Sequence, residues 1–340
     1  MKKIVLTGGG TAGHVTPNIA LLPALQAAGY EIAYVGSYEG IEKKLIADFN
    51  IPYTGISTGK FRRYLDPKNF SDPFRVMKGF VEARNYLKNY QPDVVFSKGG
   101  FVSVPVVRAA ASLHIPCIIH ESDMTPGLAN KLCIPVAEKV CCNFPETMKN
   151  IPADKAVLTG SPIRAELAQG SRLAGLNMCG FTANKPVIMV IGGSLGAANV
   201  NKAVRDALPK LLEDFQVVHL CGKDKIDNLL LNTPGYKQFE YIKAELKDIF
   251  AMADVVISRA GANAICELLA LKKPNILIPL PAASSRGDQL LNAASFEAQG
   301  YSIVLNEDDI TTNLLVDKVH ELYFNRQNYV EAMSRSHQMD

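Results

Sequence analysis

The sequence predicts an α/β protein made of two Rossmann-like domains, each built on a doubly wound parallel sheet. Short apolar runs alternate with helical patterns along the chain, and the strand, glycine turn and helix of the amino terminus are repeated from Val187. Each series holds six candidate strands, and 340 residues with 48% hydrophobic residues can fill two cores. We expect an N-terminal domain over 1–160, a linker over 161–175 and a C-terminal domain over 176–340, with the last helix in the second domain or packed back on the first.

Composition excludes several classes of protein. A net charge of +3 is too small to indicate a nucleic-acid binder, so no nucleic acid is expected as a partner. No apolar run approaches the roughly 18 residues that would span a bilayer, and the run Ile4–Leu6 is too short for the core of a signal peptide. The seven cysteines form no C-x-x-C pair, which favours buried thiols over disulfides or zinc ligands. We therefore expect a cytoplasmic protein without a bound metal.

The first segment, KKIVLTGGGTAGHVTPNIALL, is predicted to form a buried strand, a glycine-rich turn and a helix. Gly8, Gly9, Gly10 and Gly13 allow φ angles that other residues resist. As a dinucleotide fingerprint the segment is incomplete, because the next strand, EIAYVGS, ends without the acid that binds a ribose, so no cofactor is expected. His14 follows the turn and is a candidate general base; the alternative is that it braces the turn.

The other strands of the first series are predicted at 93–97, 117–120, 139–144 and 156–159. Those of the second series after the one at Val187 are QVVHLCG, FEYIK, DVVIS, NILIPL and SIVLN. Glu121 stands at a strand end in HES and is a second candidate acid or base, or a residue that orients a loop through backbone hydrogen bonds. His120 beside it emerges from an apolar strand and is better explained as structural.

The segment from Asp254 to Ala293 reads as a strand, a polar turn, a helix and another strand. In an open parallel sheet ligands bind just past the carboxyl ends of the strands, so the turns at Gly261 and after Leu280 are predicted to border a binding crevice. The amides that open the helix can meet negative charge. Glu267, one turn into the helix, can accept hydrogen bonds from sugar hydroxyls or is simply a solvated helix residue.

Residues 60–90 hold eight Lys or Arg against three acids, a local charge of +5. One face of the expected helix carries Val76, Phe80, Ala83 and Leu87, flanked by Phe74, Met77 and Val81, with Arg75, Lys78, Glu82 and Lys88 opposite. This pattern suits an ordinary core helix with a solvated basic face, or a basic amphipathic helix on an anionic membrane. Because KFRRY precedes it, we expect membrane contacts from Phe61, Arg62, Arg63, Phe74, Arg75, Lys78 and Phe80.

Five blocks of the chain together resemble one family of enzymes. They are GGGTAGHVTPNIAL, SKGGFVSVPV, HESDMTPGLANK, GSPIR with GGSLGA, and AGANAICE through SRGDQ. In this order, and over nearly the whole chain, they are similar to the MurG family of N-acetylglucosaminyltransferases of peptidoglycan synthesis. The resemblance implies the GT-B architecture, in which two Rossmann-like sheets face each other across a cleft.

The resemblance also implies a reaction. It would be the transfer of N-acetylglucosamine from UDP-N-acetylglucosamine to the 4-hydroxyl of undecaprenyl-diphospho-N-acetylmuramoyl-pentapeptide, converting lipid I to lipid II with inversion. Such a role serves cell wall biogenesis, cell shape and cell division at the cytoplasmic face of the cell membrane, where the enzyme is peripheral. Expected partners are the UDP-sugar, the lipid-linked muramoyl-pentapeptide acceptor and the anionic membrane surface, with cell-wall synthesis proteins as further candidates.

The resemblance assigns site residues position by position. On the acceptor side these are Thr11, Ala12, Gly13 and His14, with Ala12 standing where the family has another glycine. On the donor side they are Arg164, Ser194 for the diphosphate, Ile242 for the uracil edge, Ala262, Asn263, Ala264, Ile265, Cys266 and Glu267 for the sugar and ribose, and Gln289 for the N-acetylglucosamine hydroxyls. The family's H-E-Q-N reads HESD here, so a contacting amide becomes Asp123, an acceptor-only group when ionised.

No D-x-D pair occurs in the chain, which argues against a metal-held diphosphate. Backbone amides at glycine turns and helix ends, with Arg164, are then expected to stabilise the leaving group, and activity should survive chelation. Two alternatives stay open from the residues alone. The chain could be a GT-B enzyme with another acceptor or a UDP-sugar epimerase, or a non-catalytic UDP-sugar-binding subunit.

Overall fold

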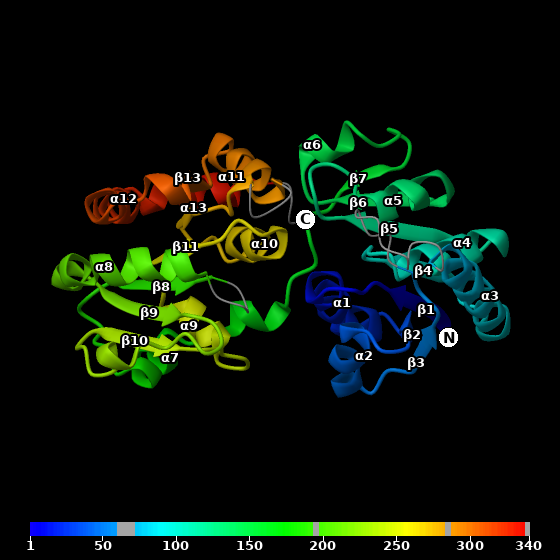
Figure 1. Ribbon diagram of the computed structural model, residues 1–340, viewed down its shortest axis with the longest axis horizontal. Coiled ribbons are helices and arrows are strands. Elements are labelled where there is room, and N and C mark those ends of the chain that lie inside the picture. Colours follow the sequence, from blue (N-terminus) through cyan, green and yellow to red (C-terminus); the bar gives the residue numbers. More distant parts are fainter. Residues whose placement is uncertain (60–71, 193–196, 283–286, 337–340) are drawn as a thin grey trace. The chain divides into compact units, whose positions relative to one another are not determined.

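The structure is a computed structural model that describes residues 1–59, 72–192, 197–282 and 287–336. The described chain divides into two compact units, with the boundary between Arg164 and Ala165. Each unit is a parallel β-sheet with helices on both faces (Figure 1). The prediction of two doubly wound α/β domains is therefore confirmed.

The first unit contains a seven-stranded sheet in the order β3-β2-β1-β4-β5-β6-β7. Its strands are β1 (Lys2–Thr7), β2 (Tyr30–Ser37), β3 (Tyr53–Ile56), β4 (Val94–Ser97), β5 (Cys117–Glu121), β6 (Lys139–Cys142) and β7 (Ala156–Leu158). The sequence predicted six strands and missed β3. This edge strand is four residues long and buries only Ile56 fully, so its hydrophobic signal is weak.

Alternation along the central strands builds a core on each face of this sheet. Val5 and Val95 pack on one face with helix α4, while Ile4 and Leu6 pack on the other with α1. The helices are α1 (Thr16–Ala27), α2 (Ile41–Ile46), α3 (Asp72–Tyr90), α4 (Ser103–Ser112), α5 (Leu128–Cys133) and α6 (Pro145–Met148), with short 3₁₀ segments η1 (Ala12–His14), η2 (Ala47–Phe49) and η4 (Ile134–Val136).

The second unit contains a six-stranded sheet in the order β10-β9-β8-β11-β12-β13. Its strands are β8 (Val187–Ile191), β9 (Gln216–Leu220), β10 (Tyr236–Phe239), β11 (Val255–Ser258), β12 (Asn275–Leu277) and β13 (Ser302–Val304). The strand expected at FEYIK was placed too late in the chain. The real strand β10 buries Tyr236 and Gln238, whereas Tyr241 and Lys243 beyond it are exposed.

Helices flank this second sheet as well. They are α7 (Arg172–Cys179), α8 (Ala198–Asp214), α9 (Leu246–Met252), α10 (Ala262–Ala270), α11 (Asp288–Ala298), α12 (Thr312–Phe324) and α13 (Arg326–Ser334), with η5 (Ala165–Gln169), η6 (Asn228–Leu230) and η8 (Glu307–Asp309). The segment expected as a linker packs closely on α9: a Cβ on Gly170 would lie 2.0 Å from the Lys247 carbonyl oxygen, and one on Gly175 2.4 Å from that of Asp248.

The strand order places one topological switch point in each sheet. In the first sheet it lies between β1 and β4, and in the second between β8 and β11. The turns that leave these strands at their carboxyl ends are where an open α/β sheet binds its ligands. The glycine-rich turn after β1 and the turn at Gly261 after β11, both predicted from the sequence, occupy such positions.

The seven cysteines are all free thiols, and six of them are buried. Burial raises the pKa of Cys117, Cys133 and Cys179 to about 12, so these thiols stay protonated. The expectation of buried thiols without disulfides is met.

Among the described helices, none is long and apolar enough to cross a membrane.

Candidate active site

The turn after β1 contains two kinds of glycine. Gly8 and Gly10 have φ angles of 154° and 84°, which side chains resist. Gly9 has an ordinary φ, and Gly13 lies within η1. Gly9 is instead required for space, because a Cβ there would lie 2.5 Å from the carboxyl carbon of Glu42.

His14 closes the turn and is half-buried. Its Nδ1 lies 3.1 Å from the Gly9 carbonyl oxygen and 3.0 Å from the Thr11 Oγ1. A carbonyl oxygen can only accept, so the neutral ring carries its proton on Nδ1 and its lone pair on Nε2. Both interpretations of His14 are therefore compatible: the ring braces the turn through Nδ1, and that contact selects the tautomer in which Nε2 is the basic atom.

A second glycine turn follows β4, the neighbour of β1. Gly99 and Gly100 have φ angles of 94° and 83°. A Cβ on Gly100 would lie 2.3 Å from the Gly9 carbonyl oxygen and 3.2 Å from Nδ1 of His14. The two turns thus meet at the switch point of the first sheet, and a side chain at position 100 would displace the imidazole.

Lys98 is a buried residue that the sequence analysis did not single out. Its Nζ donates to Nδ1 of His120 at 2.8 Å and to the Ser122 hydroxyl, and Nε2 of His120 donates to the Gly160 carbonyl oxygen at 2.7 Å. Burial, and then the charge of Lys98, hold the pKa of His120 well below its usual value. His120 is thus a neutral structural residue, and it anchors the start of the GSPIR segment that carries Arg164.

The Glu121 carboxylate is buried and fully engaged by the loop that follows it. Oε1 accepts from the Asp123 amide at 2.9 Å, and Oε2 accepts from the Gly127 amide at 3.1 Å and from Nδ2 of Asn130 at 2.8 Å. This is the geometry of a loop-orienting residue, the second of the two roles considered for Glu121. The loop holds Asp123, whose own carbonyl accepts from Thr147.

In the second unit, the turn after β11 is fixed by Arg259. The guanidinium is buried, pairs with Glu307, and donates to the carbonyl oxygens of Ile278 at 3.0 Å and Pro279 at 3.2 Å. Asn292 adds a hydrogen bond from Nδ2 to the Ala260 carbonyl at 3.0 Å. Sequence reasoning assigned no role to Arg259 or Asn292, because neither shows by its spacing that it reaches this turn.

Helix α10 begins directly after this turn, and its N-cap is Gly261, which has no side chain to cap the first amides. Ala262, Asn263, Ala264 and Glu267 are half-buried on the opening turns, whereas the side chains of Ile265 and Cys266 are buried in the core. Ile242 is buried as well. These three buried residues can reach a ligand through their backbone only.

The remaining predicted donor contacts are dispersed along the chain. Gln289 at the start of α11 accepts a hydrogen bond from the Leu280 amide at 3.1 Å, which joins α11 to the turn after β12. Arg164 is half-buried at the boundary of the first unit. Ser194 lies outside the described residues, as do Phe61, Arg62 and Arg63 of the expected membrane surface.

A neutral side-chain network supports the start of α8, the helix that follows the segment with Ser194. Nε2 of His219 lies 2.9 Å from Oδ1 of Asn201, the Tyr236 hydroxyl lies 2.8 Å from Nδ1 of the same ring, and Asn201 donates to the Cys221 carbonyl at 2.8 Å. Burial lowers the pKa of His219 to about 3, so the ring is neutral. This network fixes the first turns of α8 to the carboxyl end of β9.

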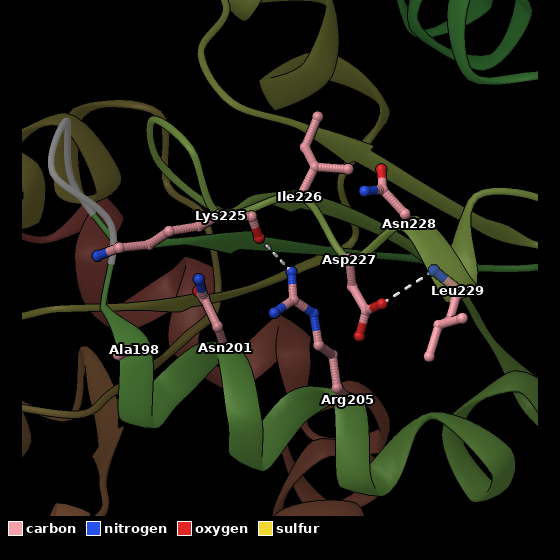
Figure 2. Close-up of a pocket in the computed structure, with 8 residues that line it drawn as sticks. All are labelled: Ala198, Asn201, Arg205, Lys225, Ile226, Asp227, Asn228 and Leu229. Carbon is pink, nitrogen blue, oxygen red and sulfur yellow. Dashed lines mark hydrogen bonds between the residues drawn. The ribbon is translucent and has the colours of Figure 1, made fainter.

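A pocket of about 550 Å³ lies between α8 and the chain after β9 (Figure 2). It is lined by Ala198, Asn201, Arg205, Lys225, Ile226, Asp227, Asn228 and Leu229. Its polar groups largely pair with one another: Nη2 of Arg205 donates to the Lys225 carbonyl at 2.6 Å, and Asp227 accepts from the Leu229 amide at 3.0 Å. None of the sequence-predicted site residues is among the described residues of this lining.

The outer surface of α3 carries an exposed apolar stripe. Phe74, Met77 and Val81 are 78%, 64% and 52% exposed and lie three to four residues apart, on one side of the helix. Phe80, by contrast, is half-buried and packs against the core with α4, apart from the exposed stripe, and its expected membrane contact stays a prediction. Arg75 and Lys78 are exposed beside the stripe.

Within the described ranges, no group of three or more His, Cys, Asp or Glu side chains is placed to hold a metal ion. Each unit has its own set of candidate turns. One presents His14 at the switch point of the first sheet, and the other presents the amides of α10 at the switch point of the second.

Comparison with known proteins places both sets in one family. Residues 4–142 match the Glycosyltransferase family 28 N-terminal domain, and residues 187–340 match the Glycosyltransferase family 28 C-terminal domain. Curated relatives from Lachnospira eligens and Lachnoclostridium phytofermentans are each 65% identical over 340 residues, covering 100% of this chain and 96% of the relative. Both are named UDP-N-acetylglucosamine--N-acetylmuramyl-(pentapeptide) pyrophosphoryl-undecaprenol N-acetylglucosamine transferase.

Solved structures agree with this assignment. The crystal structure of Acinetobacter baumannii MurG matches with a TM-score of 0.77 and 28% identity over 99% of this chain and 96% of that chain. A UDP-GlcNAc 2-epimerase from Methanocaldococcus jannaschii matches with a TM-score of 0.68 at 14% identity, over 95% of this chain and 93% of that chain, and so shares the fold alone. The fold is GT-B, the resemblance to the MurG enzymes is confirmed, and the chain belongs to glycosyltransferase family 28.

Proposed function

We propose that this chain transfers N-acetylglucosamine from UDP-N-acetylglucosamine to the 4-hydroxyl of undecaprenyl-diphospho-N-acetylmuramoyl-pentapeptide, the step from lipid I to lipid II in peptidoglycan synthesis. Relatives named for this reaction are 65% identical to it from end to end, through both domains. The structural observation that supports the chemistry is the His14 ring, held at Nδ1 by the Gly9 carbonyl.

His14 is the general base of the proposal. Its Nε2 takes the proton of the muramyl 4-hydroxyl while the hydroxyl oxygen bonds to C1 of N-acetylglucosamine, and the bond from C1 to the diphosphate breaks with its electron pair leaving on UDP. One displacement inverts the configuration at C1, and no covalent enzyme intermediate is needed. Glu121 serves this step indirectly, since its carboxylate orients the loop that holds Asp123.

The donor is assigned to the second unit. We assign the diphosphate to the backbone amides at the start of α10, to Ser194 and to Arg164, and Glu267 accepts from the ribose hydroxyls. Ile242, Ile265 and Cys266 contribute backbone groups because their side chains are buried. Gln289 forms hydrogen bonds with the sugar hydroxyls, and the hydrogen bond that it accepts from the Leu280 amide fixes its orientation.

The acceptor is lipid-linked, and the exposed stripe of α3 is suited to the membrane that holds it. Phe74, Met77 and Val81 form an apolar strip, and Arg75 and Lys78 add positive charge beside it. We assign this surface to peripheral binding at the cytoplasmic face of an anionic membrane. Arg62 and Arg63 extend the basic sequence that precedes the helix.

The test is a transfer assay with isotope-labelled UDP-N-acetylglucosamine, a soluble lipid-linked muramoyl-pentapeptide analogue, and EDTA. We expect UDP release that depends on the acceptor and survives EDTA, with label in the disaccharide product. UDP-sugar epimerisation or UDP release without the muramoyl compound would contradict the assigned reaction. Donor binding without turnover would instead indicate a binding subunit.

A further inference from the structure

Glu42 is a buried carboxylate beside the first glycine turn, and nothing in the proposed reaction has used it so far. It is the second residue of α2 and is 0% exposed. Its Oε1 accepts from the Ser37 amide at 2.9 Å and from the Ser37 hydroxyl, and its Oε2 accepts from the Gly10 amide at 3.1 Å. A buried carboxylate is tolerated when donors surround it in this way.

Three glycines make room for this side chain. A Cβ on Gly9 or Gly40 would lie 2.5 or 2.1 Å from the carboxyl group of Glu42. One on Gly36 would lie 2.8 Å from Cγ of Glu42 and 2.3 Å from the Tyr53 hydroxyl oxygen, and all three glycines have φ outside the left-handed region. They come from the turn after β1, from β2 and from the N-cap of α2. Space rather than backbone conformation therefore favours glycine at these positions. Gly9 and Gly40 leave room for the carboxylate, and Gly36 leaves room for the stem of Glu42 and for the Tyr53 hydroxyl.

The contact from Glu42 reaches His14 through a single peptide group. The Gly10 amide that donates to Glu42 and the Gly9 carbonyl that accepts from Nδ1 of His14 belong to the same peptide bond. A hydrogen bond to one end of a peptide polarises the group and strengthens the bond at its other end. The carboxylate, the peptide and the imidazole thus form a chain in which each member orients the next.

We infer that Glu42 is a positioning residue for catalysis: its carboxylate fixes the Gly9–Gly10 peptide, and that peptide holds the His14 proton on Nδ1 so that Nε2 is the base. Glu42 does not touch substrate, and no proton passes to it. Its role resembles that of a carboxylate that orients a catalytic histidine directly, with one peptide group inserted between them. The inference rests on the proposed role of His14.

The first test is Glu42→Gln, with the exposed Glu39→Gln as the matched control. The three groups around Glu42 are all used as donors, so one of them would face the new amide NH₂. We expect kcat to fall about 10- to 100-fold, as misplacement of a catalytic group does. The KM for UDP-N-acetylglucosamine should stay within twofold, because every donor residue assigned here except Arg164 lies in the other unit. Glu39→Gln should match the unmodified enzyme.

The second measurement needs no substrate. Long-range ¹H–¹⁵N spectra of ¹⁵N-histidine-labelled protein report the tautomer of each neutral ring, and with six histidines His14 can be assigned from a His14→Gln spectrum. We expect the Nδ1–H form of His14 in the unmodified protein and a mixture of tautomers in Glu42→Gln. This readout separates the inference from the proposed reaction, because the tautomer shifts whether or not the acceptor is correctly identified.

Gly40→Ala provides an independent perturbation should Glu42→Gln fail to fold. The added methyl would press on Glu42 from the side of α2, leaving the Gly9–Gly10 peptide itself unchanged. A loss of the Nδ1–H tautomer with a lower kcat is the expected result. A folded Glu42→Gln or Gly40→Ala protein that keeps both the tautomer and kcat within twofold would overturn the inference and leave Glu42 as an anchor of α2 alone.

Discussion

The turns at the two switch points are held by groups of opposite character. The turn after β1 is braced by the anionic Glu42, whereas the turn after β11 is braced by the Arg259 guanidinium and the Asn292 amide. Next to the second turn, α8 is anchored by the neutral pair of His219 and Asn201. The folds are alike, but the signs of the buried charges differ.

The work assigned to each turn explains this difference. A base that takes a proton is helped by a nearby negative charge, which stabilises the imidazolium as it forms. A departing diphosphate is hindered by a buried carboxylate, so neutral or positive braces suit the donor turn. Where the donor turn does use a carboxylate, that of Glu307, it is neutralised by Arg259. In each turn, the buried supporting group is therefore suited to the charge that develops there: an anion supports the forming imidazolium, and a cation and a neutral amide support the turn assigned to the diphosphate.

The largest expected effect comes from removing the base of the first turn. His14→Ala should lower kcat about 10²- to 10⁴-fold, the usual range for a general base. Steady-state UDP release with saturating acceptor measures it. Thr11→Val, which removes only the hydroxyl near Nδ1 and keeps the Gly9 contact, should cost far less. Equal losses in the two variants would mean that the turn, rather than the base, was disrupted.

The brace of the second turn should matter for stability. Arg259→Leu leaves Glu307 buried without its cation, which we expect to cost about 3–5 kcal/mol of unfolding free energy. Arg172→Leu breaks the more exposed pair with Asp254 and should cost about 1 kcal/mol. Urea unfolding compares the two. If Arg259→Leu costs no more than Arg172→Leu, the donor turn does not depend on a buried cation.

The neutral His219 ring that supports α8 predicts a pH dependence of the free energy of unfolding. The pKa of His219 is about 3 in the folded state and has its ordinary, higher value in the unfolded chain. At pH values between these two pKa values only the unfolded chain binds the proton, so the free energy of unfolding rises as the pH rises through this range. Between pH 5 and 7 the difference should be about 2 kcal/mol. Urea unfolding of His219→Gln at the two pH values should lack this share of the change. An unaltered pH dependence would show that His219 titrates normally in the fold.

His320 offers a control of opposite sign. The hydrogen bond with Asp214 raises the pKa of His320. The stabilising contribution of His320 is complete at pH values below the ordinary pKa of histidine, and it is lost as the pH rises through the raised pKa of the folded state. His320→Gln should therefore destabilise the protein more at pH 5 than at pH 7, the reverse of the effect at His219.

The last prediction concerns the surface of α3. Arg75→Glu with Lys78→Glu should weaken binding to anionic vesicles by about 1 kcal/mol for each charge near the membrane. Lys210→Glu in the second unit, exposed on α8, is the control for net charge. Cosedimentation with anionic and neutral vesicles measures binding. Unchanged sedimentation of the double variant would remove α3 from the proposed membrane surface.

Local pattern was enough to predict most of the fold. The strand, turn and helix series could be predicted because buried parallel strands are short apolar runs and the helices between them are periodic. The errors arose where that signal weakens. β3 is a short edge strand with one fully buried residue, and β10 is half-exposed, so its position along the chain was misjudged.

The site was predicted only in part, for a physical reason. His14 and Glu267 stand beside glycine turns in the sequence, so their position indicates them. Glu42 reaches the first turn from 32 residues beyond it, and two helices and two strands separate Arg259 from its partner Glu307 in the chain. Such braces follow from tertiary packing. Gly36 and Gly40 leave room for Glu42, but Gly36 stands in a predicted strand and the sequence analysis gave neither glycine a role.

One binding measurement tests the division of work between the two turns most directly. Calorimetric titration of UDP-N-acetylglucosamine into His14→Ala should give a Kd within twofold of the unmodified enzyme, although that variant has lost transfer. Glu267→Ala should weaken the same binding. If His14→Ala instead loses donor affinity in step with transfer, the first turn is part of the donor site, and the assignment of base and donor to separate turns is wrong.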